Sequence, residues 1–338
     1  MTKMSSNYKA LTFAELCDRL TERAETVIIF HDRPDGDATG SAFALRALLE
    51  AMGSKTYCVC ADEVHHRCRF AVEGLCDSVL PEKLPRDFKI ERVISVDTAA
   101  RTQIKGLEGR FDLNIDFMID HHGRGEPYAD HYVDAGAAAC GEIVYDIGEE
   151  LIRRGTIAKF PERFCMLTYM AIATDTGCFK YSNTTPATHR RVAGLMDGSF
   201  DYADVNFRLF DCKSAEELKV SAAAQSNMRY FFDGKLAIAA LDYKQIMALG
   251  VPVDYFDGLI ATARSIEGVE VAISVRQMTP EHIFRVSTRS NGEADVSALC
   301  AVFGGGGHVK AAGCSVSAPT LDAAIEMIVA QAEKLFRF

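Results

Sequence analysis

The sequence predicts an α/β protein with two domains, the first built around a parallel sheet whose strands end in acidic and histidine residues. At 338 residues, the chain is longer than one typical hydrophobic core requires. The apolar runs at 27–30 (VIIF), 93–96 (VISV) and 117–119 (FMI) are continuous and not alternating. Such runs are typical of parallel strands covered on both faces. We therefore expect a parallel sheet with helices on both faces, followed by a smaller α/β domain.

Helices and strands alternate through the first half of the chain. In the second predicted helix, Ala42, Leu45, Leu48 and Met52 recur at helical spacing, and Gly53 stands where a C-terminal cap belongs. The other predicted helices lie at 13–24, 137–153, 161–173 and 188–196, and a further strand lies at 56–61.

The pattern changes after about residue 205. Residues 213–230 are charged, rich in alanine and free of glycine and proline, which predicts a connecting helix. The remaining elements are expected as strands at 235–241, 269–276, 283–289 and 314–317, and as helices at 294–302 and from 321 onward. We place the domains at 1–205 and 233–338, with a linker helix at 206–232 and a cleft between the domains.

The composition excludes several classes of protein. With 47 acidic against 37 basic residues, the net charge is −10, whereas a protein that binds long duplex nucleic acid needs a basic groove. A small or short anionic substrate fits better. The chain shows no signal-peptide pattern and no apolar run long enough to span a bilayer. Together with an odd number of cysteines, 11, this predicts a cytoplasmic protein with reduced thiols and no membrane partner.

A group of cysteines near histidines invites comparison with zinc sites. Cys58, Cys60, Cys68 and Cys76 lie close to His65 and His66 in the sequence, but their spacing matches no common zinc pattern. The sequence leaves the role of these cysteines open.

Acidic and histidine residues follow each of the three apolar runs. His31, Asp35 and Asp37 follow the first run, Asp97 the second, and Asp120, His121 and His122 the third; Asp175 follows a predicted helix. Each has an ordinary structural interpretation by itself. Asp37 could cap a helix, Asp35 lies in a Pro-Gly turn, and His121 could be a buried core residue.

Taken together, these residues favour a metal site. Four carboxylates at the ends of one sheet would each cost several kcal/mol if buried without a partner, and they would raise one another's pKa. Two divalent cations would neutralise them. Carboxylate and imidazole ligands without thiolate favour Mn²⁺ or Mg²⁺ over structural zinc, with Co²⁺ also tolerated. The four carboxylates belong to Asp35, Asp37, Asp97 and Asp175.

The motifs together resemble a known superfamily. HDRPDGDATGS, SVDTAA, DHH and TDTGCF are similar to the four motifs of the DHH phosphoesterase superfamily, and GGGGHVKAAG resembles the hallmark of its DHH-associated C-terminal domain. The resemblance covers nearly the whole chain, with the motifs in order. TGCFKYSNTTPATHR and FGGGGHVKAAG are most similar to the nanoRNases, the branch of oligoribonucleases and pAp phosphatases.

The resemblance implies roles for individual residues. It assigns His31, Asp35 and Asp97 to one metal and Asp37, Asp97, His121 and Asp175 to the other, with Asp97 as the bridge. It also implies that Asp120 is a weak ligand or orients an imidazole, and that His122 faces the scissile phosphate or protonates the leaving group. Domain 1–205 would then be catalytic and domain 233–338 would bind substrate.

A run of glycines in the second domain predicts a phosphate-binding element. Four consecutive glycines are entropically costly, and their backbone N–H groups can form an anion nest. We assign Gly305, Gly306, Gly307 and His308 to a second phosphate of the substrate. Arg289, which matches an Arg-Ser pair of the family, and Arg264 are the accompanying cations.

The function expected from these observations is hydrolysis of short oligoribonucleotides and of 3′-phosphoadenosine-5′-phosphate (pAp) by water activated between two metal ions. One alternative is a phosphodiesterase for cyclic or linear dinucleotides, such as c-di-AMP, pApA or pGpG. A non-catalytic nucleotide-binding module is another, but it predicts a lost ligand position, and none is lost. A homodimer is expected only as the commonest assembly of soluble enzymes.

Overall fold

The computed structural model describes residues 8–75, 80–107, 114–123 and 125–336. Over these residues the chain forms two compact units, residues 1–212 and residues 213–338. The division falls inside the predicted linker at 206–232. The helix α7 (Ala215–Ser226) is not a free connector, because its Val220 and Ala224 are buried in a hydrophobic cluster of the second unit. Cys76 lies outside the described residues.

The first unit contains the predicted parallel sheet. Its strand order is β2-β1-β3-β4-β5, and every neighbouring pair is parallel. The first four strands are almost entirely buried, which accounts for their continuous apolar sequences. The strands are β1 (Thr26–Ile29), β2 (Thr56–Val59), β3 (Arg92–Val96), β4 (Phe117–Asp120) and β5 (Asp130–Val133).

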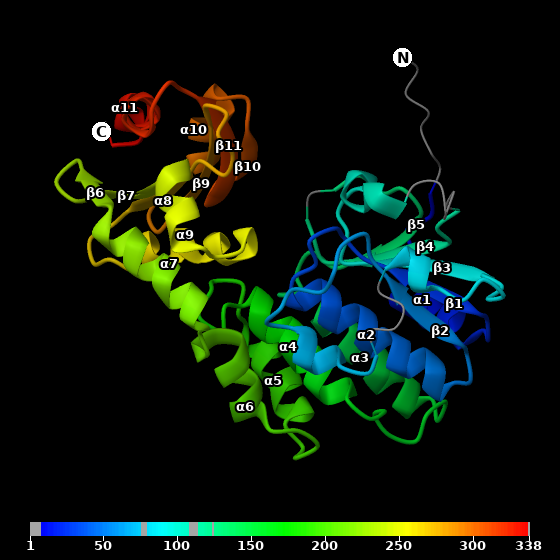
Figure 1. The fold of residues 1–338 in the computed structure, drawn as a ribbon. Helices are drawn as coiled ribbons and strands as arrows, with labels where there is room; N and C mark the ends of the chain where they lie inside the picture. Colours follow the sequence, from blue (N-terminus) through cyan, green and yellow to red (C-terminus); the bar gives the residue numbers. More distant parts are fainter. Residues whose placement is uncertain (1–7, 76–79, 108–113, 124, 337–338) are drawn as a thin grey trace. The chain divides into compact units, whose positions relative to one another are not determined.

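The two faces of this sheet are covered differently. Side chains of α1 to α4 form one large core with one face, and Figure 1 shows α2, α3 and α4 running together beside the sheet. Within the described ranges, the other face packs against 3-10 helices and loop residues and not against long α-helices. The helices are α1 (Phe13–Thr21), α2 (Gly36–Ala51), α3 (Cys140–Arg153), α4 (Phe164–Asp175), α5 (Pro186–Leu195) and α6 (Tyr202–Asn206). Shorter helical segments are η1 (Arg69–Val72), η3 (Pro81–Lys83), η4 (Arg101–Leu107) and the π-helical turn η5 (Phe207–Asp211).

Helices α2 and α4 approach each other closely through two glycines one helical turn apart. A Cβ on Gly40 would lie 2.4 Å from the backbone oxygen of Leu167, and one on Gly36 would lie 2.4 Å from the Thr174 side chain. Only glycine fits both positions without a shift of α4. This packing brings the first turn of α2 next to the last turn of α4.

The second unit contains a six-stranded mixed sheet. Its order is β10-β11-β9-β8-β7-β6, in which β7 and β8 are parallel and the other neighbours antiparallel. The predicted loop of glycines contributes a short strand to this sheet, because residues 306–308 pair with the strand that follows. The strands are β6 (Met228–Phe231), β7 (Leu236–Leu241), β8 (Val271–Arg276), β9 (Ile283–Ser290), β10 (Gly306–His308) and β11 (Ala311–Ser317).

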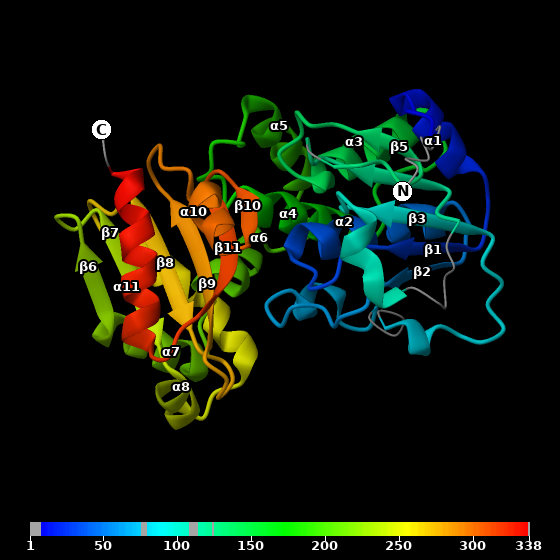
Figure 2. The same cartoon turned by 90° about the horizontal axis from the view of Figure 1, so that it is seen from above.

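Helices lie on both faces of the second sheet. One face packs against α10 and α11, and the other against α7, α8 and α9, as Figures 1 and 2 show from two directions. Among the described residues, no helix combines the length and apolar character needed to cross a membrane. The elements are α8 (Tyr243–Leu249), η6 (Val253–Gly258), α9 (Leu259–Arg264), α10 (Val296–Val302), α11 (Leu321–Ala332) and η7 (Glu333–Leu335).

Candidate metal centre

The carboxyl ends of three neighbouring strands bring the predicted ligands together. In a sheet of order 2-1-3-4-5, the connections leave β1 and β3 in opposite directions, and α/β proteins place their sites at this switch point. His31 follows β1 by two residues, Asp97 directly follows β3, and Asp120 ends β4. The apolar strands therefore fix the positions of the three segments.

Two helices supply the remaining carboxylates. Asp35 is the N-cap of α2 and accepts a hydrogen bond from the Ala38 N–H at 3.0 Å. The helix cap is therefore Asp35, and not Asp37 as the alternative structural interpretation had it. Asp37 lies in the first turn of α2 and is fully buried. Asp175 is the last residue of α4. The glycine contacts between α2 and α4 bring these helix ends together.

One group of ligands surrounds the His31 imidazole. Its Nε2 atom lies 3.8 Å from Asp35 Oδ1 and 3.7 Å from Asp97 Oδ2. The other ring nitrogen, Nδ1, lies 2.8 Å from the carbonyl oxygen of Asp32, which accepts its proton. That bond sets the tautomer in which Nε2 carries the lone pair, as in histidines that bind metals.

The second group surrounds the His121 imidazole in the same way. Its Nε2 atom lies 3.3 Å from Asp175 Oδ2, 3.6 Å from Asp37 Oδ2 and 3.5 Å from Asp97 Oδ1. Its Nδ1 atom lies 3.3 Å from the Ala137 carbonyl oxygen. The two oxygens of Asp97 thus face different groups, Oδ2 toward His31 and Oδ1 toward His121.

Without cations, three of the four predicted carboxylates are electrostatically unfavourable. For Asp35, the effect of burial is outweighed by the hydrogen bond with His31, which lowers the pKa of that carboxyl group. Burial, followed by the charges of Asp37 and Asp35, raises the pKa of Asp97 well above its usual range. The same causes raise the pKa of Asp175 to about 9, and burial also raises the pKa of Asp37. These shifts are expected where several acids share a site shielded from water.

The residues fit a pair of divalent cations. The Asp97 Oδ1 atom is buried and has no hydrogen-bond partner among the described residues. Asp97 also has a φ of 52°, a left-handed conformation that costs energy for a residue with a side chain, and its N–H donates to the Ile119 carbonyl at 3.0 Å. Metal ligation accounts for the buried Asp97 oxygen that has no hydrogen-bond partner. It also accounts for the strained backbone that holds this residue between the two imidazole–carboxylate groups.

Asp120 orients its neighbours and lies outside the two groups. Its Oδ1 atom accepts hydrogen bonds from the backbone N–H groups of His121 and His122, at 2.8 and 3.3 Å, and lies 2.7 Å from His122 Nδ1. This contact raises the pKa of His122, whose side chain is 33% exposed. His122 is therefore the imidazole of this cluster best placed to carry a proton near solvent.

Residues that support Asp37 are missing from the sequence-based prediction. Its carboxylate accepts hydrogen bonds from the N–H groups of Cys140 and Gly141, at 2.7 and 2.9 Å, and from the Ser41 hydroxyl at 2.8 Å. The two N–H groups belong to the first turn of α3, where a helix favours an anion. Ser41 could have been found, because it lies four residues after Asp37 on the same face of α2.

Asn183 is a second supporting residue that the sequence analysis did not identify. Its side-chain amide donates to the carbonyl oxygens of Ala138 and Asp175, at 3.0 and 3.1 Å. It thereby ties the end of α4 to the segment that precedes α3. No spacing rule points to Asn183, because the contact depends on how the loop after α4 folds back.

In the second unit, Arg289 and His308 share one side of the sheet. Arg289 of β9 is the register partner of Ala311 in β11, and Ala311 is the partner of His308 in β10. Arg264 donates through Nε to the Asn291 side chain at 3.0 Å, just beyond the end of β9. The structure therefore gathers the two predicted arginines and His308 around this end of β9.

The glycine run has a structural role in addition to the predicted phosphate binding, because it ends α10 and packs closely against β11. The N–H groups of Gly304 and Gly305 donate to carbonyl oxygens of α10, at 3.1 and 2.9 Å, and so end that helix. A Cβ on Gly305 would lie 2.2 Å from the Gly313 carbonyl oxygen, and one on Gly307 would lie 2.5 Å from that of Ala311. The close approach to β11 thus accounts for Gly305 and Gly307. The N–H of Gly305 already donates to the Cys300 carbonyl oxygen of α10.

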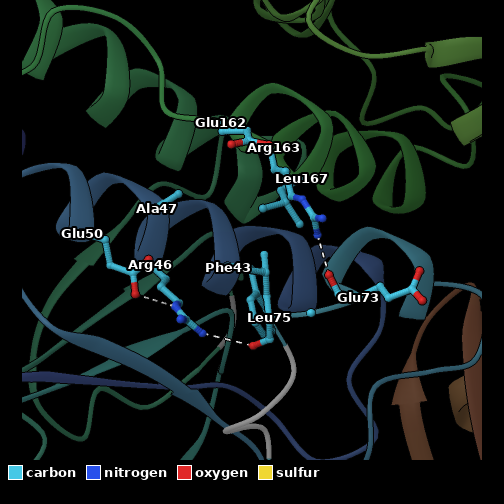
Figure 3. Close-up of a pocket in the computed structure, with 10 residues that line it drawn as sticks. Phe43, Arg46, Ala47, Glu50, Glu73, Leu75, Glu162, Arg163 and Leu167 are labelled. Carbon is cyan, nitrogen blue, oxygen red and sulfur yellow. Dashed lines mark hydrogen bonds and ion pairs between the residues drawn. The ribbon is translucent and has the colours of Figure 1, made fainter.

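A cavity of about 280 Å³ between α2 and α4 lies apart from these ligands. Its walls include Phe43, Arg46, Glu73 and Arg163. As Figure 3 shows, Arg46 donates to Glu50 and to the Leu75 carbonyl, and Arg163 donates to the Glu73 carbonyl. The cationic groups are thus engaged with the protein's own oxygens, and no ligand of either metal group lines the cavity.

Comparison with known proteins identifies both units. The profile of the DHH family, N-terminal domain, matches residues 25–174, and that of the DHHA1 domain matches residues 234–334. The chain is 31% identical over 305 residues to the bifunctional oligoribonuclease and PAP phosphatase NrnA of Thermus thermophilus, covering 89% of this chain and 87% of that protein. It is 26% identical over 297 residues to the protein of the same name from Bacillus subtilis, covering 86% and 90%.

Solved structures share the fold. An exopolyphosphatase-related protein from Bacteroides fragilis has a TM-score of 0.84 at 21% identity, covering 99% of this chain and 98% of that one. A structure of RecJ from Thermus thermophilus in complex with Mn²⁺ has a TM-score of 0.52 at 13% identity, covering 95% of this chain and 54% of that one. Both similarities confirm the predicted α/β architecture.

Proposed function

Because the chain belongs to the DHH family and also carries a DHHA1 domain, we propose that it hydrolyses phosphoester bonds in short oligoribonucleotides and in pAp. The products would be 5′-nucleoside monophosphates from the oligonucleotides and AMP from pAp. The names of the relatives support this substrate class, and the ligand set that the structure brings together supports catalysis over a purely binding role. The proposal depends on one observation, which is that the two carboxylate oxygens of Asp97 face two separate imidazole–carboxylate groups.

We assign one divalent cation to each group. His31, Asp35 and Asp97 would hold the first cation, and His121, Asp37, Asp175 and the other oxygen of Asp97 the second. The donors are carboxylates and imidazoles only, which favours Mn²⁺ among the metals that accept such a set. When bound, a pair of such cations lowers the pKa of water and offsets charge on phosphoryl oxygens.

The other residues then have defined tasks. Asp120 holds His122 through Nδ1, so Nε2 is the ring nitrogen that would donate to the scissile phosphate or to the leaving oxygen. Ser41 and the first turn of α3 keep Asp37 oriented, and Asn183 fixes the carbonyl end of α4 beside Asp175. These contacts hold the ligands in place before substrate binds.

We assign the binding of a second phosphate of the substrate to the second unit. Arg289 supplies charge and His308 a ring N–H donor from one side of the sheet, and Arg264 lies beside the end of the same strand. Gly306 and Gly307 expose backbone next to His308, where a side chain would obstruct approach.

A substrate panel tests the proposal. The purified protein with Mn²⁺ is incubated with pAp, RNA dimers to pentamers, cyclic dinucleotides and pyrophosphate, and the products are separated by chromatography. We expect AMP from pAp and 5′-monophosphates from the RNAs, with activity lost on chelation and in His121→Ala. Failure to cleave either pAp or short RNA while another phosphoester is hydrolysed would overturn the substrate assignment. Much faster cleavage of pApA, pGpG or a cyclic dinucleotide than of pAp would favour a dinucleotide phosphodiesterase.

A further inference from the structure

The strained turn at Asp97 is held by hydrogen bonds on both sides of that residue. The φ of Asp97 is 52°, and such a conformation persists only where the surrounding contacts fix it. The Asp97 N–H donates to the Ile119 carbonyl oxygen of β4 at 3.0 Å. The Thr98 hydroxyl donates to the Val96 carbonyl oxygen at 3.0 Å. The carbonyl oxygen of Thr98 accepts a further bond, which comes from a different part of the chain.

The donor of this further bond is Tyr128, which lies between β4 and β5. Its hydroxyl donates to the Thr98 carbonyl oxygen at 3.2 Å and lies 2.6 Å from Ser95 Oγ. Because the phenol has a single proton and gives it to Thr98, the Ser95 hydroxyl is the donor in the shorter bond. Ser95 and Tyr128 are buried, with exposed fractions of 0% and 8%. The two hydroxyls thus connect β3, just before Asp97, to the carbonyl just after it.

A close approach of two loops allows this contact. Gly125 lies three residues before Tyr128, and a Cβ on it would lie 2.4 Å from the Ala99 carbonyl oxygen. The segment after β4 therefore runs directly against the segment after β3. Tyr128 and Met118, the register partner of Ser95, belong to the cluster on the sheet face opposite α2 and α4. Tyr128 thus reaches the turn from the face away from the helices that supply the other carboxylates.

The position of Tyr128 lets it influence metal ligands that it does not touch. One oxygen of Asp97 faces His31 and the other faces His121, so a rotation of the turn would move both oxygens at once. Burial raises the pKa of Tyr128, so the phenol stays protonated and keeps its donor at neutral pH. Loss of this donor would leave a buried carbonyl oxygen, that of Thr98, without its bond from Tyr128.

We propose that Tyr128 is a positioning residue, which fixes the turn at Asp97 so that both carboxylate oxygens are oriented before cations bind. The inference rests on the proposed function, since it concerns the bridging ligand of the two assigned cations. Ser41 differs from Tyr128, because it donates to Asp37, a ligand of the second group only. Loss of the Tyr128 hydroxyl should therefore weaken the binding of both cations, whereas loss of the Ser41 hydroxyl should weaken one.

Calorimetric titration of the metal-free, full-length protein with Mn²⁺ tests this inference without any substrate. In Tyr128→Phe, we expect both Mn²⁺ dissociation constants to rise about tenfold, because removing a group that orients a metal ligand costs about 10–100-fold in affinity. Ser41→Ala should raise one dissociation constant and leave the other at its wild-type value. An effect of Tyr128→Phe on one cation only would overturn the proposed action through the bridging carboxylate.

Ser95→Ala breaks the same hydrogen-bonded chain at its other end. It should raise both dissociation constants by less than Tyr128→Phe does, and it provides the test independently of how well Tyr128→Phe folds. The double variant should bind Mn²⁺ no more weakly than Tyr128→Phe alone, because the two hydroxyls act as one unit. Additive losses in the double variant would contradict this coupling.

Tyr169→Phe is the matched control for the loss of a buried tyrosine hydroxyl. Tyr169 also lies in the first unit, and its hydroxyl accepts a hydrogen bond from the Asn206 side-chain amide at 2.7 Å. Thermal melts without metal should show lower stability for both tyrosine variants, but Tyr169→Phe should keep both wild-type Mn²⁺ dissociation constants. Equal losses of Mn²⁺ affinity in the two variants would reveal a general effect of destabilisation and overturn the role of Tyr128.

The outcomes also separate this inference from the proposed function. If the wild-type protein binds two Mn²⁺ ions and Tyr128→Phe binds both more weakly, the role of Tyr128 stands even when neither pAp nor RNA is cleaved. If the wild-type protein cleaves pAp and short RNA but Tyr128→Phe binds Mn²⁺ with unchanged constants, the role of Tyr128 is wrong and the proposed function stands. A wild-type protein that binds no Mn²⁺ would overturn the metal assignment and the role of Tyr128 together.

Discussion

At the residue scale, Asp97 is a buried carboxylate surrounded by other carboxylates, which is electrostatically unfavourable without metal. It follows a buried strand, adopts a left-handed backbone conformation and places one oxygen near each of two histidines. Its pKa is raised by burial and by neighbouring carboxylates, so it is a poor stabiliser of the metal-free fold. The same position is favourable once cations neutralise the cluster.

Replacing Asp97 with asparagine should therefore separate metal binding from folding. In Asp97→Asn without metal, we expect the free energy of unfolding to be unchanged or higher, because a neutral side chain relieves repulsion between carboxylates. The rise in Tm on adding Mn²⁺ should disappear, and kcat/KM should fall more than about a hundredfold. Thermal melts and steady-state kinetics check both effects. Asp233→Asn, an exposed substitution in the second unit, should change neither quantity.

At the element scale, the packing of α2 on α4 decides where two carboxylates meet. Gly36 and Gly40 allow α2 to approach α4 closely. Gly40 lies against the Leu167 backbone, and Gly36 lies against the Thr174 side chain. Asp37 at the start of α2 and Asp175 at the end of α4 thereby reach the same imidazole, His121. A small separation of the helices would pull the two carboxylates apart.

Gly40→Ala should consequently lower both stability and metal affinity. The added Cβ would lie 2.4 Å from the Leu167 carbonyl oxygen, so α4 must shift. Overpacking of this kind costs about 1–3 kcal/mol, against a gain of about 1 kcal/mol from the better helix propensity of alanine. Denaturant unfolding and calorimetric titration with Mn²⁺ measure the two effects. The control is Gly258→Ala, where nothing lies within 4 Å; equal stability losses in both variants would refute the packing argument.

At the scale of the whole molecule, each unit has its own hydrophobic core. The first unit buries both faces of its parallel sheet, and the second buries its mixed sheet between two layers of helices. All residues of the two proposed metal groups lie in the first unit. Metal binding should therefore stabilise one unit only.

Scanning calorimetry of the full-length chain should show this asymmetry. At an Mn²⁺ concentration about 100 times Kd, binding adds about 2.7 kcal/mol to the unit that holds the metal, which corresponds to a rise in Tm of about 5–10 °C. We expect one thermal transition to move by this amount and the other to stay in place. A single transition that moves as a whole would show that the units unfold together, and Asp97→Asn should abolish the shift in either case.

The sequence by itself determined the parallel sheet, the order of its strands along the chain and the identity of the clustered acids and histidines. Buried parallel strands read as continuous apolar runs, and ligands directly follow them, so local sequence carries both signals. It also assigned Arg289 and His308 to the binding of one phosphate by the second domain, and strand register places them on one side of the sheet. The sequence predicts a connecting helix around α7, and only the structure shows that Val220 and Ala224 of this helix are buried in the second unit.

Tertiary structure decided which residues support the ligands. Ser41 and Asn183 act on ligands through contacts set by helix packing and loop folding, and the α2–α4 approach depends on glycines whose neighbours are more than 100 residues away in the chain. Likewise, Tyr128 contacts the turn at Asp97 only because the segment after β4 folds against the segment after β3. Local sequence specifies whether a segment forms a helix or a strand. The distances between segments are set by tertiary packing, which depends on residues far apart in the chain.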